Sequence, residues 1–386
     1  MSHFNVVRVT GNLCRFSPNG DKVAYCVENK LTVRHTRTFD ECHTFSCVDV
    51  IEHIEWSPDN QYILCALYQY STIQVFSLRN HDWKCKLKDT VSGIVDVWWS
   101  PDSRHILTCA EFHVSICIWS LVSQSVKHIR GVKETTSPSL AFSADGRWLA
   151  VVGQQGAVDC VSIFSTSWDL KKQIACVGLG RVEGFSWTLD SSAVCVWEGS
   201  QGICHLQVYG AARGDLIGNF ELSCVGVMSG IKTMAWAGSG QFLGLSCFDD
   251  KLVCGRPVII SSLQLDLDKP TELSGIGLAV FSSCGYFLAT RADKMPAAIW
   301  IWSIKETRLH AVIVHKQPVT AICWAPDEPR LAIVSGSNFV SIWISKEVTV
   351  CMTDHICVSD VRWQPSGECL ALYAGTKVVF LPLSVF

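Results

Sequence analysis

The sequence lacks the signals that mark secreted, membrane-bound or nucleic-acid-binding chains. It has no block of five or six like charges, and its longest uninterrupted basic run is Lys171-Lys172. Neither a nucleic-acid arm nor a polybasic membrane patch is therefore predicted. The start MSHFNVVRVTG has no apolar core of secretory type, and the chain contains no Asn-x-Ser/Thr acceptor. These absences favour a cytoplasmic protein without membrane insertion.

Metal-binding and disulfide patterns are also missing, although the chain has 20 cysteines. There is no Cys-x-x-Cys. The closest pairs, Cys42 with Cys47 and Cys351 with Cys357, have no His-x-x-x-His or second cysteine pair nearby to complete four ligands. Most cysteines lie in apolar runs such as YILCALY and AICWAP, where a free thiol behaves as a small buried hydrophobe. We expect reduced core cysteines, no metal and no cofactor.

One long charge-free stretch, LSGIGLAVFSSCGYFLAT at 273–290, approaches the length of a membrane-spanning helix. Its centre, Phe281 to Gly285, is a turn-rich break between two apolar runs of strand length. This pattern is typical of a buried hairpin rather than a membrane helix.

What the sequence does contain is a repeat. A five-residue pattern of an aromatic residue followed by turn-forming residues recurs at intervals of 40, 43, 43, 45, 49, 45, 43 and 39 residues. An active site is built once, so this regularity marks a structural repeat rather than a catalytic motif. The copies are FSPNG at 16–20, WSPDN at 56–60, WSPDS at 99–103, FSADG at 142–146, WTLDS at 187–191, WAGSG at 236–240, FSSCG at 281–285, WAPDE at 324–328 and WQPSG at 363–367.

Each repeat reads as four short strands. In one unit, β-rich runs at 93–99, 105–110, 114–121 and 125–130 are separated by turn residues. Pro, Asp and Gly-type residues suit the first turn because Pro presets φ, Asp bonds its own backbone and Gly or Asn tolerates positive φ. Four-stranded units of about 40–45 residues indicate a β-propeller.

The two ends of the chain predict how the ring closes. The last repeat stops before a clear fourth strand, whereas the first is preceded by a spare β run at 4–10. The N-terminal segment can therefore complete the last blade and leave no open edge. We expect an all-β fold in which residues 1–386 form one domain, a closed ring of about nine four-stranded blades. Two smaller propellers are the rival, but no linker rich in Pro, Gly or Ser divides the repeats.

The repeats also resemble a known family. The strand ends VFSL (75–78), IWSL (118–121), IWSI (301–304) and SIWIS (341–345) are similar to WD40 strands, without the WD dipeptide itself. The segments at 51–68, 99–107, 287–312 and 324–333 resemble WRAP-type WD-repeat proteins, which are named for a gene antisense to a tumour-suppressor gene. The likeness runs from about residue 8 to the C-terminus. Family members carry a longer insertion between the repeats at 236 and 281 and a short tail; both are reduced here.

The resemblance implies a WD-repeat adaptor at the centrosome, centriolar satellites or spindle pole. Such proteins act with a coiled-coil anchoring protein of the SSX-interacting or Msd type and, in fungi, with a minus-end-directed kinesin. They help tether microtubule minus ends, assemble the mitotic spindle and support ciliogenesis. The alternative is a propeller that recognises a short or modified peptide in another cytosolic or nuclear complex.

Motifs for catalysis are weak. The string VMSGI around Ser229 lacks the first glycine of a nucleophile elbow, and the Gly-rich 178–184 segment has the wrong spacing for a dinucleotide-binding loop. His105 and His113 flank a strand and its following loop, which is a weak basis for a metal pair. We expect a non-enzymatic protein without a small-molecule substrate.

Protein-binding candidates are sought in the loops that join second to third strands, because these gather on one face of a propeller. Trp83 and Trp168 lie in loops on the opposite face. Each either packs within the protein or anchors an interface with a partner. For each candidate in the loops between second and third strands, the alternative to partner contact is a solvated loop whose aromatic side chain packs inward. These candidates are Tyr68, Tyr70, Glu111, Phe112, His113, Arg291, Asp293, Lys294, Met295 and Pro296.

Overall fold

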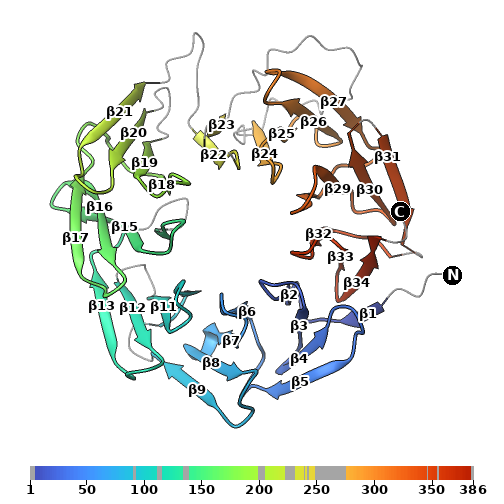
Figure 1. Ribbon diagram of the computed structural model, residues 1–386, viewed down its shortest axis with the longest axis horizontal. Coiled ribbons are helices and arrows are strands. Elements are labelled where there is room, and N and C mark those ends of the chain that lie inside the picture. The colour runs from blue at the N-terminus through green and yellow to red at the C-terminus, as the bar shows by residue number, and fades with distance from the viewer. Residues whose placement is uncertain are drawn as a thin grey trace, which may run out of the picture.

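The computed structural model describes residues 5–89, 93–110, 115–133, 139–198, 205–221, 231–238, 240, 243–247, 275–345, 347–353 and 356–383. In these ranges the chain forms antiparallel sheets arranged around a central axis, with the first strand of each sheet innermost and the last outermost (Figure 1). The predicted all-β propeller is confirmed. Eight of the described sheets have four strands, and one has two. The outer strands expected for that sixth repeat fall on 248–274, which lie outside the described residues.

The first five sheets, named blades 1 to 5, follow one another along the chain. Blade 1 contains β2 (Cys14–Phe16), β3 (Lys22–Val27), β4 (Lys30–His35) and β5 (Glu41–Ser46). Blade 2 contains β6 (His53–Trp56), β7 (Tyr62–Leu67), the 3-10 helix η1 (Tyr68–Tyr70), β8 (Thr72–Ser77) and β9 (Lys84–Lys88). Blade 3 contains β10 (Asp96–Trp99), β11 (His105–Cys109), β12 (Ser115–Ser120) and β13 (Val126–Arg130). Blades 4 and 5 contain β14 (Leu140–Phe142), β15 (Trp148–Gln155), β16 (Val158–Ser165), β17 (Leu170–Ala175), and β18 (Gly184–Trp187), β19 (Ala193–Glu198), β20 (His205–Gly210), β21 (Leu216–Glu221).

The remaining sheets, blades 6 to 9, return the chain to its start. Blade 6 contains β22 (Ile231–Trp236) and β23 (Leu243–Cys247). Blade 7 contains β24 (Ile276–Phe281), β25 (Phe287–Ala292), β26 (Ala298–Ser303) and β27 (Arg308–Val314). Blade 8 contains β28 (Ala321–Trp324), β29 (Arg330–Val334), β30 (Phe339–Ile344) and β31 (Glu347–Met352). Blade 9 contains β32 (Asp360–Trp363), β33 (Cys369–Ala374), β34 (Lys377–Pro382) and β1 (Asn5–Arg8).

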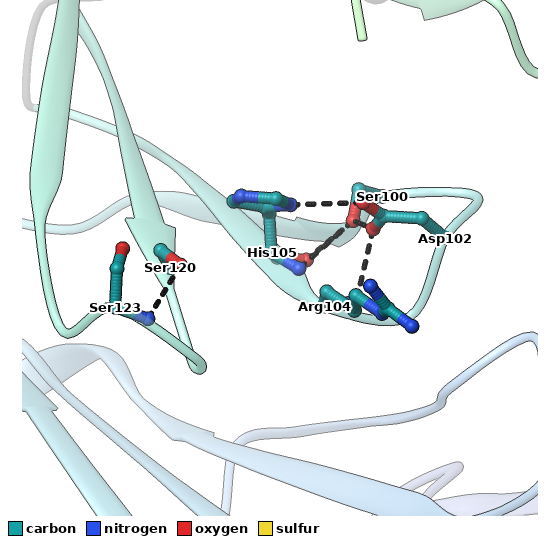
Figure 2. Close-up of polar contacts among 6 residues, drawn as sticks. All are labelled: Ser100, Asp102, Arg104, His105, Ser120 and Ser123. Carbon is teal, nitrogen blue, oxygen red and sulfur yellow. Dashed lines mark hydrogen bonds and ion pairs between the residues drawn. The ribbon is translucent and has the colours of Figure 1, made fainter. Parts of the chain in front are cut away.

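The repeated motif forms the turn between the first two strands of a blade. In blade 3 the Ser100 hydroxyl donates to the Asp102 carboxylate, which also accepts from the Arg104 amide at 2.9 Å (Figure 2). The Ser100 hydroxyl oxygen accepts from the His105 amide at 3.0 Å, and the His105 ring lies 3.0 Å from Asp102. A buried serine and an aspartate thus satisfy backbone groups that the turn would otherwise leave unpaired.

The last motif position needs a backbone conformation that few residues adopt easily. Asn60 has φ of 62° and Gly146 has φ of 69°, both in the left-handed region. Small or Asx-type residues tolerate this region, which explains why Gly, Asn and Ser recur there. The residue at this motif position also links neighbouring blades. The Asn60 side-chain oxygen accepts from the Asn19 backbone amide at 3.0 Å, and the Ser103 hydroxyl accepts from the Asp59 backbone amide at 3.0 Å.

Where the motif aromatic is tryptophan, it joins its blade to the one before it. The Trp56 indole donates across to the Arg15 carbonyl at 3.0 Å, on the first strand of blade 1. Four equivalent tryptophans repeat this bond, because each carries its ring into the apolar layer between blades while its N–H needs a partner. In blade 6 the Trp236 indole donates instead to the Ser186 hydroxyl of blade 5, at 3.2 Å. The other bonds to first-strand carbonyls are Trp99 to Glu55 (3.3 Å), Trp187 to Ala141 (3.0 Å), Trp324 to Val280 (2.9 Å) and Trp363 to Cys323 (2.9 Å).

Blade 9 closes the ring with strands from both ends of the chain. Strand β1 pairs antiparallel with β34, from Asn5 opposite Phe380 to Arg8 opposite Lys377. The predicted role of the N-terminal segment as the fourth strand is confirmed. The Tyr373 hydroxyl of blade 9 also donates to the Cys14 carbonyl of blade 1 at 2.7 Å. Both contacts join segments that lie at opposite ends of the sequence.

Two further expectations concern the described residues. The charge-free stretch forms the antiparallel hairpin β24–β25, and no described helix is long and apolar enough to span a membrane. The 16 cysteines whose side chains are described form no disulfide with one another. Nine of the 16 are buried, including Cys65 in the layer between blades 1 and 2.

Candidate protein-binding face

The antiparallel order of the strands divides the connections between two faces. Motif turns and the loops between third and fourth strands lie on one side, here named the turn face. Loops between second and third strands, and between one blade and the next, lie on the other side, named the loop face. The candidates Tyr68, Tyr70 and 291–296 belong to the loop face. Glu111, Phe112 and His113 lie outside the described residues.

The 291–296 loop is held mainly by contacts within the protein. The Arg291 guanidinium donates to the Val319 carbonyl at 2.6 Å, in the connection that leads to blade 8, and lies 3.8 Å from Asp293. The Asp293 carboxylate accepts from the Gly275 amide at 3.2 Å, and the Pro296 carbonyl accepts from the Val319 amide at 2.8 Å. Residues 291–297 are all half-buried. Arg291, Asp293 and Pro296 therefore hold two loops together.

The two tyrosines of η1 lie in different environments. Tyr68 packs against the apolar cluster between blades 2 and 3, and its burial raises the pKa of its hydroxyl. Tyr70 is 52% exposed, and the hydrogen bond from its hydroxyl to Asp49 raises the pKa of Tyr70. Tyr68 is thus an inward-folded aromatic, and only Tyr70 presents its ring to solvent.

Two exposed valines flank Asp49, the residue that accepts a hydrogen bond from the Tyr70 hydroxyl. Val48 is 60% exposed and Val50 is 45% exposed, on either side of Asp49 in the connection from blade 1 to blade 2. The Asp49 carboxylate accepts from the Val50 amide at 2.7 Å, and this bond, followed by that from Tyr70, lowers the pKa of Asp49. We name Val48, Val50 and Tyr70 the loop-face patch.

The structure does not bring the predicted loops together. The η1 helix lies in blade 2 and the 291–296 loop in blade 7, across the ring from one another (Figure 1). A single small ligand cannot contact both. A long partner laid over the loop face is the arrangement that reaches them.

On the turn face, the rings of Trp83 and Trp168 pack against other side chains of the protein. The Trp83 ring lies 5.1 Å from the Tyr62 ring within blade 2. Trp168 lies edge-on to His105 of blade 3 at 5.1 Å and also contacts Phe142. Both rings are half-buried against apolar clusters. Of the two alternatives for these residues, the structure shows packing within the protein.

At the position before the motif aromatic, charged side chains occur only in three consecutive blades of the ring. The residue before the motif aromatic is Arg15 in blade 1, Glu55 in blade 2 and Arg362 in blade 9, whereas the other six repeats have uncharged residues there. Burial, and then repulsion from Arg362, lowers the pKa of Arg15. The Arg362 guanidinium lies 5.1 Å from the centroid of the Tyr373 ring.

Glu55 is a half-buried acid at the joint between blades 2 and 3. Burial raises its pKa from 4.5 to about 7, and the Trp99 amide donates to its carboxylate at 3.4 Å. Folding therefore favours the protonated form. Below pH 4.5 Glu55 is protonated in both the folded and the unfolded chain, so its contribution to stability is complete. Between pH 4.5 and about 7 the unfolded chain ionises first, and the contribution declines. Above about pH 7 both states are ionised and the contribution is lost.

We expect Glu55→Gln to stabilise the protein at alkaline pH only. Glutamine keeps a hydrogen-bonding side chain without a charge, so at pH 8 it removes a penalty of roughly 1–3 kcal/mol. At pH 4.5 the variant and wild type should unfold at the same denaturant concentration. Urea unfolding at both pH values measures the difference. Equal effects at the two pH values would show that ionisation of Glu55 is not the cause.

Where the structure describes them, the weak catalytic and metal motifs of the sequence lie in separate parts of the fold. Among the described residues no three His, Cys, Asp or Glu side chains are placed to hold a metal ion. The Gly-rich 178–184 segment leads into strand β18 rather than a helix, and its Gly180 amide donates to Glu198 at 2.9 Å. His105 is paired with Asp102 in the blade 3 turn, while Ser229 and His113 lie outside the described ranges.

Comparisons with known proteins agree with this architecture. Residues 306–343 match the family model described as WD domain, G-beta repeat. The chain is 31% identical to the WD repeat-containing protein WRAP73 of Mus musculus over 95% of this chain and 92% of that protein. It is 19% identical to an uncharacterized WD repeat-containing protein of Schizosaccharomyces pombe, over 81% of this chain and 76% of that protein.

Solved structures show the same fold at low identity. The C-terminal WD40 domain of Sif2 superposes with a TM-score of 0.56 at 13% identity, covering 98% of each chain. The Dos1 propeller superposes with a TM-score of 0.55 at 11% identity, covering 86% of this chain and 92% of that one. WD40 propellers typically act as non-catalytic scaffolds that bind protein partners.

Proposed function

The chain belongs to the family of WD-repeat proteins that includes WRAP73, and we propose that it acts as a non-enzymatic scaffold at the centrosome, centriolar satellites or spindle pole. In this role it helps to anchor microtubule minus ends and to assemble the mitotic spindle, with a further role in ciliogenesis. Its partner is a coiled-coil anchoring protein of the SSX-interacting or Msd type, acting with a minus-end-directed kinesin. The family resemblance supports the location and the partner class.

The loop-face patch carries the proposal that this face binds a partner. Aromatic and aliphatic side chains exposed together on a polar surface are typical of interaction sites. Val48, Val50 and Tyr70 form such a group, and the Asp49 carboxylate holds Tyr70 in place through its hydroxyl. A coiled coil presents a long, narrow surface, so it can lie on this patch and continue across the loop face.

The 291–296 loop is the second proposed contact, through Lys294 and Met295. Arg291 is a poor choice for testing contact, because its bond to Val319 supports the loop itself. Replacing Arg291 would alter the fold of the loop together with any interface. Variants that leave Arg291, Asp293 and Pro296 intact separate these two effects.

Proximity labelling of the tagged protein in dividing cells tests the proposal. We expect wild type to label coiled-coil and spindle-pole proteins, and a Val48→Ser/Val50→Ser/Tyr70→Ser variant to lose most of that labelling. Lys294→Ala/Met295→Ala should reduce it to a smaller extent. The matched control, Val122→Ser/Leu189→Ser/Tyr286→Ser, removes two exposed aliphatic residues and one exposed tyrosine from the turn face and should label as wild type does.

Each result has a defined meaning. Labelling by wild type that is dominated by chromatin or membrane proteins would contradict the scaffold location and favour the peptide-recognition alternative. Equal loss in the loop-face and turn-face variants would contradict the assignment of the loop face. Unchanged labelling by Lys294→Ala/Met295→Ala would remove only the second contact.

A further inference from the structure

A groove separates the outer strands of blades 1 and 2 on the side of the ring. It has a volume of about 630 Å³, within the range of sites that hold ligands. Its walls come from β5 with the residues that follow it, and from β8 and β9. The lining includes Phe45, Val48, Phe76, His81, Lys84 and Lys86.

The register of blade 2 directs three lysines to the blade 1 side. Lys84 pairs with Phe76, Lys86 with Gln74 and Lys88 with Thr72, so each lysine shares a sheet face with its partner. That face points to blade 1, because Phe76 stacks on Phe45 at 4.7 Å. The alternate residues Cys85 and Leu87 pack toward blade 3 instead. All three lysines are exposed.

The base of the groove is apolar and aromatic. Phe45 and Phe76 are buried as a stacked pair, and the exposed His81 ring lies 5.0 Å from Phe45. His43 is placed 5.6 Å from His81, and its pKa is lowered by burial and then by nearby Lys22 and His81. An apolar side chain that enters the groove therefore meets aromatic carbon beneath a rim of basic groups.

Within the described part of the chain, the lysines that line this groove have no acidic residue beside them in its lining. Three acids adjoin the groove without being among its lining residues. Asp49 and Asp82 lie next to Val48 and His81, and Glu41 accepts from the Thr44 hydroxyl at 2.7 Å and is paired with Arg34. The basic lining contrasts with the chain as a whole, which has a net charge of −3. The groove thus offers a local excess of cations to an incoming chain.

We propose that this groove binds an extended, acidic segment of a partner protein that inserts one aliphatic or aromatic side chain between Phe76, His81 and Val48. Alternate residues of an extended chain lie about 6.6–6.8 Å apart, which is also the spacing of alternate lysines along β9. Acidic residues at every second position therefore match Lys84, Lys86 and Lys88. The groove shares Val48 with the loop-face patch, but its lysines and its aromatic base lie outside that patch.

A peptide fits the groove better than a nucleic acid does. Single-stranded nucleic acids require exposed aromatic faces on which bases stack, but Phe45 and Phe76 are buried against each other. The cations are also lysines on one strand rather than a broad basic surface. The acidic peptide is therefore the occupant that the observed chemistry favours.

The test selects peptides from a random twelve-residue display library on the full-length protein. We expect the enriched sequences to be acidic with at least one aliphatic or aromatic residue. A synthetic copy of an enriched peptide, followed by fluorescence anisotropy, should bind Lys84→Glu/Lys86→Glu at least about tenfold more weakly than wild type. The matched control, Lys171→Glu/Lys377→Glu, makes the same change in net charge on exposed strand residues of blades 4 and 9 and should bind as wild type does.

The outcomes separate this proposal from its rivals. Neutral or basic enriched peptides, no enrichment, or equal weakening by both double variants would overturn it. An eight-nucleotide uridine oligonucleotide that binds wild type as tightly as the peptide, and loses affinity in Lys84→Glu/Lys86→Glu alone, would assign the groove to nucleic acid instead. Circular dichroism of both variants confirms that they fold. Because Val48 lines the groove as well as belonging to the loop-face patch, the binding test relies on the lysine variants, which leave Val48, Val50 and Tyr70 unchanged.

Discussion

Deletion of residues 1–10 is expected to lower the free energy of unfolding by roughly 3–6 kcal/mol, because it removes Val7 and Val9 from the apolar layer between blades 9 and 1. The deletion also removes the four residue pairs between β1 and β34. Strand β34 then becomes an open edge, which can pair with other chains. Urea unfolding and light scattering during concentration measure the two effects.

A deletion of residues 1–4 is the control, since it leaves β1 whole. It should unfold at the wild-type urea concentration and remain monodisperse. A 1–10 deletion with full stability would mean that β1 does not contribute to closure of the ring. Lower stability without aggregation would show that another segment covers the edge of β34.

Trp324→Ala is expected to destabilise the protein by about 3–5 kcal/mol. The Trp324 ring lies in an aromatic cluster between blades 7 and 8, 5.9 Å from Trp343 and 6.3 Å from Phe287. Its indole also donates to the Val280 carbonyl of blade 7. The alanine variant leaves a cavity and an unpaired carbonyl at the same joint, and urea unfolding measures the loss.

Trp324→Phe separates packing from hydrogen bonding. Phenylalanine keeps most of the apolar contact but loses the bond to Val280, so we expect a smaller loss of roughly 1–3 kcal/mol. If the two variants lose equal stability, the hydrogen bond rather than the ring joins the blades. If neither loses stability, the recurring tryptophan has no structural role at this joint.

The sequence predicts the fold well because the repeat carries several independent signals. The motif serine and aspartate specify a turn, the following small residue specifies positive φ, and the aromatic specifies an inter-blade contact. These constraints are local, so they are readable without knowing which strands are neighbours. Closure by β1 was also predictable, since the first repeat has one strand too many and the last has one too few.

The binding surfaces were harder to predict, because they depend on exposure and on neighbours from other blades. Val48 and Val50 lie among apolar residues that normally fill a β core, and nothing in the sequence distinguishes them from buried Ile51. Conversely, Arg291 and Asp293 have the polar character of a surface contact, yet they hold a loop together.

The groove between blades 1 and 2 shows a related limit. Lys84, Lys86 and Lys88 are separated by Cys85 and Leu87, so they form no basic run in the sequence. Only the pairing of β8 with β9 shows that they share a face, and only the stack of Phe45 on Phe76 shows which blade that face meets. A pattern of period two becomes informative once the neighbouring strand is known.

The location of the protein in mitotic cells tests the central claim most directly. Fluorescence imaging of the tagged chain should show wild type and the Val122→Ser/Leu189→Ser/Tyr286→Ser control concentrated at the spindle poles. The Val48→Ser/Val50→Ser/Tyr70→Ser variant should be present at the same level but spread through the cytoplasm. A wild-type protein that is absent from the poles throughout mitosis would contradict the account.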